Sequence, residues 1–289
     1  MDWGTTLAVQ GLHGMVYGML LFLVASGLTL IFGMMGVLNF AHGALYMLGA
    51  YFSFSILRWS GSFWVSLLVA PLGVAAAGMV IERFFLRKVH AHGHAHELLI
   101  TFGIAYIIEE LVKMIWGNKP LLVVLPPALS GSVAFLGIQY PVYRLFILFV
   151  SLLVFILLFT VLFKTRIGII VRAAVANKQM TDALGFNVPL IFLLLFSMGA
   201  WLAGLAGVIG GPYLITNPGM AATIIIDLFV VVVVGGLGSV EGALIASLLI
   251  GCLQSFGILF LPQFAIVFEF LLMALVLIFR PHGLLGEAR

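Results

Sequence analysis

The residues with chemical potential in this chain are polar and ionisable groups that fall within or beside long apolar stretches. They are Asn39, His42, Glu109, Glu110, Asp227, Glu241 and Glu269. A charged group at the centre of a bilayer costs about 2.5–3.5 kcal/mol or more, so such a group normally faces a cavity or a partner. Their placement indicates a solute pathway or a proton relay within a membrane.

No enzyme signature accompanies these groups. The sequence contains no GxxxxGK[ST] nucleotide loop, no HExxH pair and no GxSxG elbow. It also offers no pair of carboxylates that would face each other across a cleft. We therefore expect no catalytic residues and no cofactor in this chain, which makes it a non-enzyme.

The run from His90 to His96 carries four histidines in seven residues and raises the question of a metal site. A metal site needs helical spacing or further ligands from a folded loop, and only Glu97 lies nearby. We favour a flexible cytoplasmic loop near the headgroups over a metal site, and expect no metal.

Three of the acidic groups have simple structural interpretations. Glu109 and Lys113 are four residues apart and can pair on one helix face. Glu241 and Glu269 lie near expected membrane interfaces, where we interpret them as solvated helix ends.

The composition is that of a membrane protein. Of the 289 residues, 64% are hydrophobic and 8% are charged, and the mean hydropathy is +1.28. Long apolar runs without strand-like alternation predict helices, because a bilayer forces backbone groups to pair internally. We predict an all-α polytopic protein in which residues 1–289 form a single transmembrane domain. The basic residues are too sparse for a nucleic-acid surface, and the lone Cys252 is expected to be a small packing residue.

Nine apolar runs could cross the membrane. They cover 10–32, 39–57, 63–82, 97–116, 142–163, 190–210, 223–234, 241–260 and 263–279. The stretch 223–260 could instead form one bent helix, which would give eight crossings.

The charge distribution favours nine crossings. The first basic residue is Arg58, so the N-terminus should face outward and 10–32 is not expected to be a cleaved signal peptide. The basic C-terminus should face inward, and this requires an odd number of crossings. The inner basic residues are then Arg83, Arg87, Lys88, Lys164, Arg166, Arg172, Lys178, Arg280 and Arg289. Arg58, Lys113, Lys119 and Arg144 lie outside, the last three in or beside a Pro-rich loop over 117–141.

The longest polar interruption runs from Lys164 to Pro189. At about 100° per residue one side of a helix gathers Ala173, Ala176, Met180, Ala183 and Leu184. The opposite side carries Arg172, Asn177, Lys178, Gln179, Thr181 and Asp182. Gly185 supplies a left-handed stop and Pro189 prevents continuation. The segment predicts one capped helix shown to a soluble partner, or alternatively an interfacial helix lying in the headgroups.

Two glycine-containing breaks interrupt the apolar runs, at 36–43 and at 235–242. A break in a membrane helix frees backbone groups that protein or water in a cavity must satisfy. Paired breaks in the two halves of a chain indicate a transport pathway built from repeats. Close helix packing through small residues is the alternative explanation.

The same motifs carry a resemblance to a known family. They are GLTLIFGMMGVLNFAHGALYMLGAY (27–51), TFGIAYIIEELVKMIWG (101–117), VRAAVANKQMTDALGFNV (171–188), VVVVGGLGSVEGALIASLLIG (231–251) and RPHGLLG (280–286). Over nearly its whole length the chain resembles the LivH-type permease of branched-chain amino acid ABC importers. The NFAHG and GGLGS blocks are the most specific.

The resemblance implies a multi-pass protein of the bacterial inner membrane, in contact with membrane lipid. It implies a LivM-type second permease, two cytoplasmic ATPase subunits that hold ATP and Mg, and a periplasmic solute-binding protein. In such an assembly the polar helix is the coupling helix to the ATPase, with Arg172, Ala173, Ala176, Asn177, Gln179, Asp182 and Gly185 as its candidate residues. The candidate pathway residues are Asn39, Phe40, His42 and Gly43, with Gly235, Gly236 and Gly238 opposite.

The chain departs from the family pattern at the four-histidine run and at Asp227. Similar permeases import urea, short amides or aromatic carboxylates, so the solute stays open beyond a branched-chain amino acid or a related small polar molecule. The competing function is a self-sufficient secondary transporter or channel in which Asp227 carries protons. A purely structural membrane anchor needs neither broken helices nor a capped polar helix, and fits worst.

Overall fold

The computed structural model describes residues 3–135 and 138–286, and the chain within them is almost entirely helical. The long helices are α1 (Trp3–Met35), α2 (His42–Ser60), α3 (Phe63–Ile81), α5 (His94–Trp116), α6 (Val142–Lys164), α9 (Val188–Gly210), α10 (Met220–Gly235), α11 (Val240–Phe260) and α12 (Ala265–Phe279). The shorter helices are α4 (Arg87–Val89), α7 (Arg166–Ala176) and α8 (Lys178–Ala183). A π-helical turn covers Glu82–Leu86, and 3-10 turns cover His90–His92, Pro127–Leu129 and Pro262–Phe264.

Every apolar run expected from the sequence coincides with one of these helices. Within the described residues, six helices are long and apolar enough to cross a membrane: Trp3–Met35, Phe63–Val89, Val142–Lys164, Val188–Gly210, Val240–Phe260 and Pro262–Phe279. The chain is therefore a multi-pass membrane protein. The stretch 223–260 forms two helices rather than one bent helix, while nine crossings stay a prediction. Arg289, counted among the inner basic residues, lies outside the described residues.

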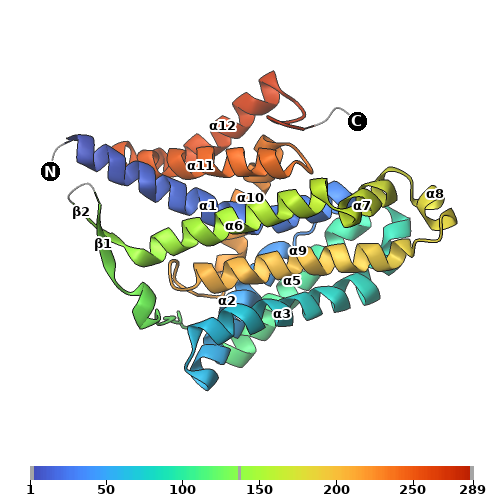
Figure 1. Cartoon of the computed structure of the whole chain (residues 1–289), viewed down its shortest axis with the longest axis horizontal. Coiled ribbons are helices and arrows are strands. Elements are labelled where there is room, and N and C mark those ends of the chain that lie inside the picture. The colour runs from blue at the N-terminus through green and yellow to red at the C-terminus, as the bar shows by residue number, and fades with distance from the viewer. Residues whose placement is uncertain (1–2, 136–137, 287–289) are drawn as a thin grey trace.

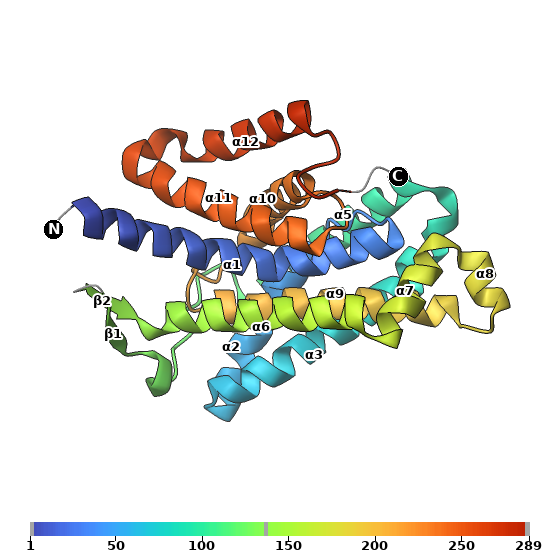
Figure 2. The same cartoon turned by 45° about the horizontal axis from the view of Figure 1, so that its top comes forward.

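Helix α1 is the centre of the bundle. Helices α11 and α9 pack against it, and Figure 2 shows α11 and α12 on one side of α1 with α9, α2 and α3 on the other. In its most apolar part 83% of the residues are buried inside the chain. This burial explains why α1 is apolar around its whole circumference.

Small residues allow these helices to approach closely. A Cβ atom at Gly14 would lie 2.7 Å from the Cα of Cys252, and one at Gly18 would lie 2.6 Å from the carbonyl oxygen of Ser247, both on α11. Lipid is as apolar as a helix surface, so membrane helices associate through such close packing. The backbone of Cys252 is part of this contact, and its side chain is partly exposed.

The all-helical prediction needs one correction, in the loop over 117–141. There β1 (Ser132–Phe135) pairs antiparallel with β2 (Ile138–Pro141), and the amide of Leu121 donates to the carbonyl of Thr216 at 2.8 Å. These pairs satisfy loop backbone groups that would otherwise be left unpaired. Burial raises the pKa of the Tyr140 phenol in this loop, and the nearby Arg144 opposes that rise.

The two ends of the bundle differ. Figure 1 shows the N-terminus and the β1–β2 hairpin at one end, and α7, α8 and the C-terminal segment at the other. We call the second one the α8 end.

Candidate functional site

The first helix break turns the chain back into the bundle. Helix α1 ends at Met35, Gly36 adopts a φ of 71°, and α2 begins only at His42. The Nε2 of His42 donates to the carbonyl of Val24 at 2.9 Å. A helix rises 1.5 Å per residue, so Val24 lies about 16 Å before the end of α1. The non-helical residues therefore run back along α1, and α2 starts inside the protein.

Polar side chains satisfy part of the backbone freed by this break. The Oδ1 of Asn39 accepts from the amide of Ala41 at 3.0 Å, and the hydroxyl of Thr101 on α5 accepts from the amide of Phe40 at 3.2 Å. Two buried atoms, Nδ2 of Asn39 and Nδ1 of His42, have no hydrogen-bond partner. An unsatisfied buried polar group costs about 1–3 kcal/mol. Two such atoms in one place make the first break a candidate functional site.

The second break lies beside the end of α1. Gly236 and Gly238 have φ angles of 103° and 89°, which favour glycine. A Cβ atom at Gly238 would lie 2.7 Å from the Cα of Gly33 on α1. The C-terminal segment satisfies backbone carbonyls at this break. The amide of Leu284 donates to the carbonyl of Val234 at 2.8 Å, and the amide of Leu285 donates to the carbonyl of Gly235 at 3.0 Å.

The predicted pathway residues form two separate groups, one beside Val24 and the other beside Gly33 on α1, and most of them lie inside the packed chain. Asn39, His42, Gly43, Gly235 and Gly236 are buried, and Phe40 and Gly238 are partly exposed. The ring of Phe40 lies 4.7 Å from that of Phe229 on α10 and 6.4 Å from that of Phe102 on α5. Their role in a pathway remains a prediction.

The prediction of a single polar helix over 171–185 is wrong. Helix α7 ends at Ala176 and α8 begins at Lys178. Between them Asn177 is extended, with φ −152° and ψ 95°, and its Oδ1 accepts from the amide of Met180 at 2.9 Å. Asparagine favours such a cap over a helix interior because its short side chain can bond to nearby backbone amides. The expected stop at Gly185 is confirmed by a φ of 87°.

The apolar side expected for this segment is turned away from the rest of the chain. Exposed positions include Ala173, Ala176, Met180, Ala183 and Leu184, together with Asn177, Gln179 and Asp182. The side chains that α7 and α8 bury are instead those of Val171, Ala174 and Thr181. Figure 1 shows both helices projecting from the end of the bundle. They therefore present an uncovered apolar surface of their own.

Arg172 attaches α7 to the bundle. Its guanidinium donates to the carbonyl of Leu162 and lies 5.6 Å from the ring centre of Phe163, both near the end of α6. A cation at this position suits the negative end of the α6 dipole and satisfies one of its free carbonyls. Arg172 therefore holds α7 to the bundle as well as lying on its polar side.

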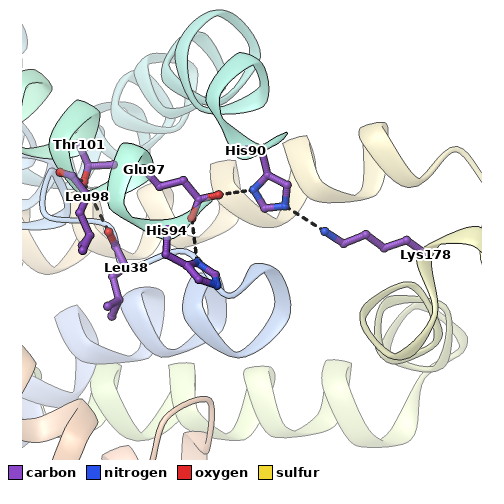
Figure 3. Close-up of polar contacts among 7 residues, drawn as sticks. All are labelled: Leu38, His90, His94, Glu97, Leu98, Thr101 and Lys178. Carbon is purple, nitrogen blue, oxygen red and sulfur yellow. Dashed lines mark hydrogen bonds and ion pairs between the residues drawn. The ribbon is translucent and has the colours of Figure 1, made fainter. Parts of the chain in front are cut away.

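The histidine run forms helical turns in place of the expected loop. His90 lies in a 3-10 turn, and α5 begins at His94. The Nδ1 of His90 contacts Oε1 of Glu97, and the Nδ1 of His94 lies 3.2 Å from Oε2 of the same carboxylate. The Nε2 of His90 lies 2.9 Å from the Nζ of Lys178 on α8 (Figure 3). In the part of the chain that the structure describes, no three histidine, cysteine or acidic side chains are placed to hold a metal ion.

The remaining acidic groups divide into one confirmed prediction and one wrong one. The Nζ of Lys113 lies 2.8 Å from a carboxylate oxygen of Glu109, as their spacing predicts, and also 2.8 Å from one of Glu110. Glu269 is only 3% exposed, so it is not a solvated helix end. The side of α12 that carries it packs inward against α10 and α11, which sequence position alone does not reveal.

Glu97, which the sequence places beside the histidine run, holds the histidine turn. Sequence reasoning missed two other residues that make polar contacts in the structure, and one of them, Thr101, supports the first break. Tyr17 donates to Oδ2 of Asp227 at 2.7 Å, across 210 residues of sequence. Nothing local marks such partners, since each depends on which helices become neighbours.

Comparison with known proteins identifies relatives of this chain. Residues 11–279 match the model of a family described as "Branched-chain amino acid transport system / permease component". The chain is 32% identical to the high-affinity branched-chain amino acid transport system permease protein BraD of Pseudomonas aeruginosa, over 96% of this chain and 95% of that protein. It is 30% identical to the permease protein LivH of Salmonella typhimurium over the same shares, and 27% identical to LivM of Escherichia coli over 94% of this chain and 69% of that protein. No solved structure matches it.

Proposed function

Because this chain belongs to the family of branched-chain amino acid transport system permease components, we propose that it forms half of the translocation pathway of an ABC importer. A second, LivM-type permease supplies the other half. Two ATPase subunits bind and hydrolyse ATP with Mg, and a periplasmic binding protein delivers the solute. The likeness to both LivH and LivM relatives supports a pair of similar permeases.

The observation that carries this proposal is the uncovered apolar surface of α7 and α8. Met180 and Leu184 are 59% and 68% exposed at the end of the bundle. Large apolar side chains grouped on a projecting segment are typical of a protein interface. We propose that this surface contacts an ATPase, so that movement of the ATPase pair displaces α7 and α8. Since the segment is divided at Asn177, it acts as two helices with a joint and not as one rigid lever.

The arrangement of the two ends of the bundle supports a proposal for the membrane orientation. We propose nine crossings in the bacterial inner membrane, with the N-terminus outside and the α8 end in the cytoplasm. Contacts at that end join segments from four parts of the chain: Gly33 with Gly238, and His90 with Lys178. Nine crossings from an outer N-terminus bring all four to the inner face.

We propose that solute crosses at the first break, between this chain and the second permease. Asn39 and His42 each carry a buried atom without a partner there, and Phe40 is partly exposed beside them. A branched-chain amino acid is the proposed solute. Binding of amino acids, urea, short amides and aromatic carboxylates to the cognate binding protein would identify it directly.

The test uses the whole importer reconstituted in vesicles, with uptake of labelled leucine and ATP hydrolysis measured together. Met180→Asp places a charge on the apolar surface of α8, and we expect it to abolish ATP-driven uptake while membrane insertion stays normal. Met180→Leu keeps the apolar contact and should transport as the wild type does. Normal uptake by Met180→Asp would overturn the interface.

A second arm of the experiment separates this function from a gradient-driven transporter. Vesicles that contain this chain alone should take up no solute when a proton gradient is imposed. Uptake under those conditions, lost in Asp227→Asn, would replace the importer by a proton-coupled transporter.

A further inference from the structure

Lys178, the first residue of α8, makes a directional polar contact with the histidine turn. Its Nζ lies 2.9 Å from Nε2 of His90. A lysine ammonium can only donate, so this ring nitrogen accepts. The proton of a neutral imidazole then resides on Nδ1, which donates to Oε1 of Glu97. The three side chains thus form one chain of hydrogen bonds from α8 to α5 (Figure 3).

Glu97 is held in place more firmly than the other two side chains of this hydrogen-bond series. It is 2% exposed, and its second oxygen lies 3.2 Å from Nδ1 of His94. A buried carboxylate with both oxygens engaged cannot turn without losing a hydrogen-bond partner. A displacement of His90 therefore also displaces Glu97 and the α5 backbone that carries it.

One turn of α5 connects Glu97 to the first break. Thr101 follows four residues later, so it lies on the same face of the helix. Its hydroxyl accepts from the amide of Phe40 at 3.2 Å and lies 3.5 Å from the carbonyl of Leu38 and 3.1 Å from that of Leu98. Residues 38–40 of the break are thus held by the same helix turn that holds the histidine turn.

Helix α8 depends on such polar contacts because little packing fixes it. Thr181 is its one buried residue in the described chain, and Lys178 also lies 4.8 Å from the ring centre of Phe192 on α9. A cavity of about 200 Å³ lies beside Lys178 and His90. Residues that line it include Met35, Val37, Glu82, Leu86, Arg87 and Val188.

We propose that Lys178, His90 and Glu97 are positioning residues that transmit displacement of α8, through Thr101, to residues 38–40. A displacement of only about 0.6 Å takes the Lys178 contact to 3.5 Å, beyond which it no longer acts as a hydrogen bond. Movement of α8 must therefore carry His90 with it or release it, and either event changes what holds the break. This inference rests on the proposed function, in which an ATPase displaces α7 and α8.

The experiment measures solute taken up per ATP hydrolysed by the complete importer in vesicles. Lys178→Met removes the donor and Glu97→Gln removes the charge. We expect each to lower the ratio by about fivefold or more, the lower end of typical coupling between sites, while ATP hydrolysis continues. Lys178→Arg keeps a cationic donor and should restore most of the ratio.

Two further variants distinguish transmission from a general structural effect. His92→Ala and His96→Ala remove exposed histidines of the same run, whose rings contact each other at 5.7 Å, and both should leave the ratio unchanged. The double variant Lys178→Met with Glu97→Gln should be no worse than either single change, because both interrupt one chain.

A wild-type ratio in Lys178→Met, or an equal loss in His92→Ala, would overturn the network. Lys178 lies at the surface, so this variant decides the matter even if Glu97→Gln fails to accumulate. If the wild type transports and Met180→Asp is inactive but Lys178→Met is normal, the network fails and the proposed function stands. If the wild type shows no ATP-driven uptake, the proposed function itself fails.

Discussion

Replacing Asn177 with alanine tests the division of the polar segment into two helices. The Oδ1 of Asn177 accepts from the amide of Met180 at 2.9 Å, and its carbonyl accepts from the amide of Thr181 at 3.1 Å. Alanine removes the first of these hydrogen bonds. Loss of an N-cap side chain costs about 1 kcal/mol, which corresponds to roughly fivefold more opening of the first turn.

Hydrogen exchange in the purified protein measures this effect directly. We expect exchange of the amides at 178–182 to accelerate about fivefold in Asn177→Ala, with α9 unaffected. Asn177→Asp retains a capping oxygen and should exchange as the wild type does. Slower exchange in Asn177→Ala would mean that alanine joins α7 and α8 into one helix, and unchanged exchange would mean that the cap contributes nothing. Either result would refute the reasoning.

Two remaining predictions concern the first break and the packing of α2. His42→Leu removes the hydrogen bond to Val24. We expect ATP-driven uptake to fall about tenfold while membrane insertion stays normal, which is the effect of losing one buried hydrogen bond. Unchanged uptake in both His42→Leu and Asn39→Leu would count against the proposed pathway. Gly49→Ala forces a Cβ atom into the backbone of Gly204 on α9, so the free energy of unfolding should drop by about 1–3 kcal/mol and thermal unfolding in detergent should occur at lower temperature. Gly103→Ala is its matched control, because nothing lies within 4 Å of a Cβ atom there and the helix should be slightly stabilised.

Glycine has two roles in this protein. At Gly49 and Gly14 the missing side chain lets two backbones touch, which membrane helices use in place of a hydrophobic driving force. At Gly236 and Gly238 the positive φ angles also matter, because a side chain would strain the backbone. Close helix packing and a transport pathway are therefore compatible explanations of the two breaks, because the same glycines can bend the chain and also pack it against α1.

Corrections to the sequence predictions cluster at the α8 end. The histidine turn and the joint at Asn177 both lie there. In this region the backbone conformation depends on capping and on partners from other helices, and helical periodicity predicts neither of them. Glu269 on α12 is a further correction of the same kind, because its surroundings come from neighbouring helices.

The amino-acid sequence by itself determined where the apolar helices run and where glycine interrupts them. A bilayer offers no water to the backbone, so each apolar run had to become a helix, and the glycines at 36 and 235–238 had to interrupt the runs. Only the tertiary structure decided that Tyr17 would meet Asp227, and that Lys178 would reach Glu97 through His90. The first set of outcomes follows from local chemistry along the chain. The second depends on which helices pack side by side, because nothing in the sequence links residues that are 88 or 210 positions apart.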